Sequence, residues 1–207
     1  QVMIRKQLNS ELKAIRSQLN PHFLFNSLNS LQNFINKSDT LTANQHLSRF
    51  SQLMRSIIEL SERESISLKE ELDFNRTFIE LEQYRYGFKC TFDIDSSIDL
   101  PNVEIPSMII QPFVENAIKF GMLTSELPLK IELASRMEGK DLVIHISNTG
   151  NWVDAEEHVA EDGGYNGTGR GIQNAVNRLD IAYPGRYQLL FEKLSHKVII
   201  TLVIRNI

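Results

Sequence analysis

The sequence of 207 residues contains a single cysteine, Cys90. One cysteine excludes an internal disulfide framework and any metal site that is built from several cysteines. A chain of this kind fits a reducing compartment.

Long apolar runs are also absent. The richest run, residues 105–117, is interrupted by two prolines, a glutamine and a glutamate, whereas a membrane-spanning helix needs ~20 apolar residues. The sequence shows no signal-peptide pattern. Because it begins at Gln1, inside a helix-like pattern, we expect a cut start, with any membrane attachment in a missing N-terminal region.

Neither sign of charge is in large excess, since 22 Lys and Arg face 26 Asp and Glu for a net charge of -4. This slight acidity argues against general nucleic-acid binding. Hydrophobic residues make up 42% of the chain and charged residues 23%, which is typical of soluble globular proteins and excludes disorder and low complexity. The length allows one or two domains.

The first glycine of the chain is Gly87, so the residues before it contain none. Apolar residues recur there at helical spacing in three stripes: Leu8, Leu12, Ile15 and Leu19; Leu24, Leu28, Leu31 and Ile35; Leu41, Leu47, Phe50, Leu53, Met54, Ile57 and Ile58. Pro21 separates the first two stripes and shifts their phase. We expect a helical hairpin that dimerises into a four-helix bundle, because neither helix can bury its stripe alone.

A third helix is predicted from Ser67, which forms a capping box with Glu70, to a stop at Gly87. Strands are predicted at residues 88–94, 129–134, 142–147, 187–192 and 198–204, with helices at 107–121 and 172–183. The second half is therefore a mixed domain of mostly antiparallel strands with helices on one face. We place the domain boundary at residue 65.

The first motif that carries chemistry contains His22 and Asn26, which share the polar face of a helix. Neutral imidazole is a nucleophile near pH 7, and Asn26, one turn later, can hydrogen-bond the ring or a group attached to it. The alternative is a solvated face with an incidental histidine.

The second motif places Glu115, Asn116 and Lys119 on one helix. It offers a carboxylate base, an amide oxygen for Mg²⁺ and a lysine for phosphate. The alternative is an ordinary ion pair between residues four apart.

The third motif has glycines at every second position, at Gly167, Gly169 and Gly171, with Thr168 between the first two. The backbone can approach a ligand closely there, and the following helix directs its amide groups at the glycines, which makes an anion site. The alternative is a flexible hinge.

The fourth motif, with Asn148 and Gly150, ends a predicted strand, where a polar side chain can face an adenine edge. Without a ligand, the same residues are simply a turn. The following residues, 151–166, are acidic and poor in apolar side chains, so we expect a mobile lid.

In this order, the motifs resemble those of LytS/YehU-type sensor histidine kinases. Residues 18–29 are similar to the phosphoacceptor signature of that family, residues 111–121 to its N box, and residues 167–171 to its G2 box. The resemblance implies an α+β protein, in which a dimerising histidine-phosphotransfer hairpin (1–65) precedes a GHKL-type α/β sandwich that binds ATP (66–207).

The resemblance also implies a role for each residue. His22 accepts the γ-phosphoryl group of ATP, Asn116 coordinates Mg²⁺, and Glu115 acts as a base or positions water. Lys119 contacts phosphate. The remaining positions bind the nucleotide, with adenine at Asn148 and Gly150 and the phosphates at Gly167, Thr168, Gly169 and Gly171.

The implied partners are a second copy of the chain and the receiver domain of a response regulator, whose aspartate takes the phosphoryl group. The implied location is the cytoplasmic part of a bacterial inner-membrane protein. GHKL proteins usually have aspartate where this chain has Asn148, so a degenerate kinase that acts as a dimeric nucleotide-binding scaffold stays open. Other GHKL ATPases lack the phosphoacceptor hairpin, and a structural coiled coil needs neither the glycine loop nor the N box.

Overall fold

The computed structural model describes residues 21–126, 128–151 and 168–207. The chain divides into two compact units, a helical unit (Gln1–Glu64 and Arg76–Gly87) and a sheet unit (Ser65–Asn75 and Phe88–Ile207). The expected seam at residues 8–19 and the expected lid after Asn151 lie outside the described residues.

The helical unit contains the predicted pair of helices, α2 (Pro21–Asn36) and α3 (Thr40–Ser61). A short turn joins them, with Ser38 at φ +56°. Asp39 caps α3, because its carboxylate accepts a hydrogen bond from the backbone N–H of Thr42 at 3.1 Å.

The buried side of α2 is formed by Phe23 and Ser27. The ring centroid of Phe23 lies 5.1 Å from that of Phe78, which belongs to the same unit. Leu28 and Ile35 of the predicted apolar stripe are 49% and 60% exposed. The other two residues of the stripe, Leu24 and Leu31, are half-buried. The stripe is therefore only partly covered in the part of the chain that the structure describes.

Helix α4 (Leu68–Tyr86) begins and ends where the sequence predicts. Ser67 and Glu70 form the predicted capping box: the Ser67 N–H donates to the Glu70 carboxylate at 2.9 Å, and the Glu70 N–H donates to Ser67 Oγ at 3.2 Å. Gly87 follows at φ +68°, a left-handed conformation that ends the helix. The first half of α4 belongs to the sheet unit and its second half to the helical unit.

The main sheet has five strands in the order β2-β4-β5-β7-β6. Their bounds are β2 (Lys89–Ile94), β4 (Lys130–Glu138), β5 (Asp141–Thr149), β6 (Tyr187–Leu194) and β7 (Lys197–Ile204). All neighbours are antiparallel except β2 and β4, which pair in parallel. This parallel pair is compatible with the predicted antiparallel-rich sheet, and it is possible because α5 (Gln111–Thr124) lies between the two strands in the chain and provides a crossover.

A second, two-stranded sheet pairs β1 (Ser65–Ser67) with β3 (Glu104–Pro106). Three-residue strands are too short for an alternating pattern to predict them.

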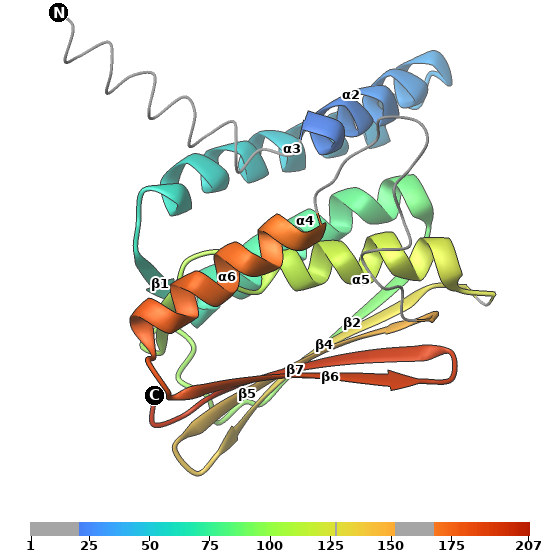
Figure 1. The fold of residues 1–207 in the computed structure, drawn as a ribbon. Coiled ribbons are helices and arrows are strands. Elements are labelled where there is room, and N and C mark those ends of the chain that lie inside the picture. The colour runs from blue at the N-terminus through green and yellow to red at the C-terminus, as the bar shows by residue number, and fades with distance from the viewer. Residues whose placement is uncertain (1–20, 127, 152–167) are drawn as a thin grey trace, which may run out of the picture. The chain divides into compact units, whose positions relative to one another are not determined.

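Helices α5 and α6 (Thr168–Ala182) lie over one face of the main sheet (Figure 1). The apolar residues of β5 and β7 meet in pairs on the core side, for example Ile146 beside Ile200 and Ile144 beside Leu202, all buried. The predicted class, a mixed fold with an antiparallel-rich sheet and helices on one face, is confirmed.

Candidate functional site

Helix α5 carries the three residues of the second motif. It begins at Gln111, later than predicted, with Pro112 in its first turn, where proline is favoured. Glu115 and Asn116 are half-buried and Lys119 is exposed. The Gln111 Nε2 donates to Glu115 Oε1 at 2.8 Å, and the Lys119 ammonium lies 5.4 Å from the ring centroid of Phe120.

The end of β5 carries Asn148 and Gly150. Asn148 is 4% exposed, and its Nδ2 donates to the carbonyl oxygen of Thr149 at 2.9 Å. The side-chain oxygen, Oδ1, is the acceptor of this amide. Gly150 adopts φ +119°, and a Cβ there would lie 2.6 Å from Thr124 Oγ1, so only glycine fits.

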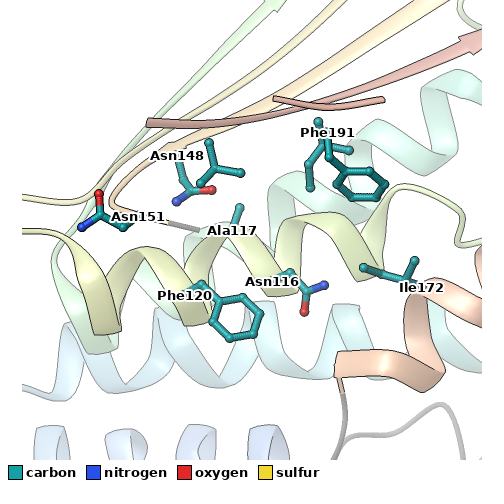
Figure 2. A pocket seen from close by; sticks show the side chains of 9 residues that line it. Asn116, Ala117, Phe120, Asn148, Asn151, Ile172 and Phe191 are labelled. Atoms are coloured by element: carbon teal, nitrogen blue, oxygen red, sulfur yellow. The ribbon is translucent and has the colours of Figure 1, made fainter. Parts of the chain in front are cut away.

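Asn116 and Asn148 line the same pocket, which has a volume of about 40 Å³ (Figure 2). They come from α5 and β5, two elements that the sequence treats as separate motifs. The other residues around this pocket are Ala117, Phe120, Asn151, Ile172, Phe191, Val198 and Ile200.

The lining of this pocket combines apolar side chains with three asparagines. Phe120, Ile172 and Phe191 provide apolar walls against which a flat base can pack. The Oδ1 of Asn148 can accept a hydrogen bond from an exocyclic amino group.

Asn116 offers a hard oxygen of the kind that Mg²⁺ shares with phosphate oxygens. The described residues contain no group of three or more His, Cys, Asp or Glu that could hold a metal ion. Asn116 is therefore a residue that could contribute one amide ligand to a metal ion.

The third motif leads into α6. Thr168 and Gly169 are its first two residues, Gly171 lies in its first turn, and Gly167 lies outside the described residues. A Cβ on Gly171 would lie 3.4 Å from the Cβ of Pro112, so the first turns of α6 and α5 are neighbours. Free amide groups in the first turn of a helix make an anion site.

The first motif belongs to the other unit. His22 is the second residue of α2, and the described side chains of that helix begin at Phe23. Asn26 is half-buried, one turn further along. All nine residues that line the pocket belong to the sheet unit.

Sequence reasoning missed Phe191 and Asn151 as parts of the pocket. Phe191 pairs with Ile200 on β7, which also pairs with Ile146 on β5, so the register places it on the core side. Asn151 was expected to open the lid, yet its N–H donates to Thr124 Oγ1 at 2.8 Å. Strand alternation indicates which residues share a side with Phe191, but not which strands lie beside it.

Comparisons with known proteins agree on one family. A family model described as histidine kinase matches residues 10–90. The chain is 35% identical over 185 residues to the sensor histidine kinase YpdA of Escherichia coli K12, which covers 87% of this chain and 32% of that protein. It is 30% identical over 207 residues to the sensor protein LytS of Staphylococcus saprophyticus. That match covers 96% of this chain and 34% of LytS. The chain thus spans about a third of the length of these relatives.

Among solved structures, the histidine kinase domain of the blue-light activated histidine kinase from Erythrobacter litoralis EL346 matches with a TM-score of 0.51. The match covers 97% of this chain and 93% of that domain at 14% identity, so it shows a shared fold. In the part of the chain that the structure describes, no helix is long and apolar enough to cross a membrane.

Proposed function

Since the chain belongs to the histidine kinase family, we propose that it is the part of a sensor kinase that uses ATP to phosphorylate His22. The phosphoryl group then passes to an aspartate in the receiver domain of a separate response regulator. The observation that carries this proposal is the pocket in which Asn116 and Asn148, from two separate motifs, lie together.

Different residues of the proposed site bind different parts of the nucleotide. Asn148 accepts a hydrogen bond from the adenine amino group, and Gly150 forms the turn that follows it at φ +119°. Asn116 is the protein ligand of Mg²⁺. Lys119 and the loop into α6 (Gly167, Thr168, Gly169 and Gly171) bind the phosphates, which suits the exposure of Lys119 and the amide groups at the start of α6. Bound Mg²⁺ supplies charge neutralisation on the triphosphate.

His22 is the nucleophile of the transfer. One imidazole nitrogen forms a bond to the γ-phosphorus while the bond from that phosphorus to the bridging oxygen breaks, and ADP leaves. Asn26 hydrogen-bonds the ring from one helical turn away. Glu115 takes up the imidazole proton or positions water, and the bond from Gln111 holds its carboxylate on the α5 surface.

We also propose that the chain acts as a homodimer. The exposed apolar residues of α2 and α3, among them Leu28, Ile35 and Leu41, form a surface that a second hairpin can cover in a four-helix bundle. In this proposal residues 1–65 are the dimerising phosphoacceptor domain and residues 66–207 the ATP-binding domain. The chain is the cytoplasmic part of a membrane-anchored bacterial sensor.

The second candidate is a dimeric nucleotide-binding scaffold without kinase activity. The observation that favours it is Asn148, an uncharged acceptor where related ATP-binding domains have aspartate. A charged acceptor makes hydrogen bonds that are roughly twice as strong. Asn148→Asp is therefore expected to tighten ATP binding in a calorimetric titration. Unchanged or weaker binding would count against the adenine contact.

Incubation with Mg²⁺ and γ-labelled ATP separates the two candidates. A kinase incorporates acid-labile label, and Asn116→Ala abolishes it by removing the magnesium ligand. The matched control is Asn44→Ala, an exposed asparagine on α3, which is expected to keep the label. Binding of ATP without incorporation of label would favour the scaffold.

A further inference from the structure

Helix α5 begins without a cap of its own. Its N-cap residue, Ile110, makes no side-chain capping bond, although the first amide groups of a helix need acceptors. Glu71 of α4 accepts from one of them and from a backbone group just before the helix: its Oε1 accepts from the N–H of Ile110 at the N-cap, and its Oε2 accepts from the N–H of Met108 two residues earlier, both at 2.8 Å. A carboxylate from another helix thus holds the backbone segment that leads into α5.

The Glu71 carboxylate is fully buried. Burial raises the pKa of Glu71 to about 7, and hydrogen bonds from Ile110 and Met108 oppose that rise. A negative charge at this position also interacts favourably with the N-terminal end of the α5 dipole. A buried carboxylate that accepts two backbone hydrogen bonds has few alternative partners, so the contact is specific.

The same short segment is held from a second helix. The Arg178 guanidinium of α6 donates to the carbonyl oxygen of Ser107 and, at 3.2 Å, to its hydroxyl. Met108, which follows Ser107 and donates to Glu71, adopts φ +56°. Residues other than glycine rarely adopt this conformation. Residues 107–110 are therefore clamped by Glu71 and Arg178 immediately before α5.

We propose that Glu71 is a positioning residue for phosphoryl transfer, which fixes the first turn of α5 and so the place of Asn116 in the pocket. The inference rests on the proposed function of α5 as the helix that binds the Mg²⁺ complex of ATP. Glu71 itself touches only protein groups in this arrangement. Its contribution is to hold Asn116 in the geometry that binding requires.

The test compares Glu71→Gln with Glu82→Gln. Glutamine keeps the shape of the side chain, but its amide group faces one of the two backbone N–H groups, so one bond is lost. Glu82 is a matched control, because it lies on the same helix, is also buried and also has its pKa raised by burial to about 7.

Two readouts are measured in the folded variants: hydrogen exchange at the Met108 and Ile110 amides, and the Kd for ATP in the presence of Mg²⁺. Glu71→Gln is expected to raise both by about tenfold, and Glu82→Gln to leave both unchanged. Glu71→Asp, which keeps the charge on a shorter side chain, is expected to give intermediate values. It also serves as the test variant if Glu71→Gln does not fold.

Normal exchange and normal ATP affinity in a folded Glu71 variant would overturn the proposal. Faster exchange with unchanged affinity would also overturn it, since Glu71 would then be purely structural. Asn116→Ala, measured in parallel, detects failure of the proposed function itself: if that variant binds ATP normally, the assignment of the pocket is wrong, whatever the exchange at residues 108 and 110.

Discussion

Replacing Gly150 by alanine is expected to destabilise the sheet unit strongly. Gly150 lies directly after β5 at φ +119°, outside the range of ordinary L residues. An added Cβ would lie 2.6 Å from Thr124 Oγ1. That hydroxyl donates to the Phe120 carbonyl oxygen at 2.8 Å and accepts from the Asn151 N–H at 2.8 Å. The new methyl group therefore meets a side chain that is held in place.

The two effects can be added approximately. Forcing alanine into this backbone conformation costs about 1–3 kcal/mol, and losing one or two of the Thr124 hydrogen bonds costs about 1–2 kcal/mol more. The expected loss is therefore about 2–5 kcal/mol, a large part of the total stability of a typical domain.

Chemical denaturation of Gly150→Ala and Gly139→Ala measures this loss. Gly139 also has a positive φ, +67°, but an added Cβ there meets nothing within 4 Å. Gly139→Ala is expected to cost only about 1–2 kcal/mol. Equal losses in the two variants would show that the contact with Thr124 contributes nothing and would refute the reasoning.

Three further predictions concern other parts of the chain. Gly171→Ala is expected to raise the free energy of unfolding by about 0.5–1 kcal/mol, because alanine favours the helix. The same variant is expected to bind ATP more weakly, and normal binding would exclude this glycine from the phosphate site. The raised pKa of Glu82, about 7 instead of 4.5, means that the folded protein holds this proton more tightly than the unfolded chain does, so stability is lost as pH rises from 4.5 to 7. Glu82→Gln is expected to remove this loss of about 3 kcal/mol in denaturation experiments across that range, and an unchanged pH dependence would contradict it. Ser67→Ala is expected to cost about 1 kcal/mol by removing the α4 cap, and a neutral effect on the denaturation midpoint would contradict the capping role.

Local patterns predicted most of the secondary structure. The capping box at Ser67 and the stop at Gly87 mark the ends of α4 within one residue, because both signals act between residues that are close in sequence. Pro112 explains why α5 begins later than its apolar pattern indicates, since proline favours the first turn of a helix.

Contacts between distant segments could not be predicted in the same way. The parallel pairing of β2 with β4 and the position of Phe191 in the pocket depend on strand order and register, which no local pattern encodes. Glu71 was hidden for the same reason: in sequence it is one more acidic residue of a helix, and its role becomes visible only when Met108 and Ile110 lie beside it.

The four motifs were predicted unequally well. Asn116 and Asn148 were chosen from separate patterns, and they line one pocket. The functions assigned to them, and the roles of His22 and of the loop before α6, stay predictions.

The most direct test of the central claim identifies the residue that carries the phosphoryl group. Purified wild-type protein, His22→Gln and His196→Gln are incubated with Mg²⁺ and γ-labelled ATP; His196 is an exposed histidine in the turn between β6 and β7. The proposal predicts acid-labile label on the wild type and on His196→Gln, and none on His22→Gln. Label on His22→Gln at the wild-type level would contradict it.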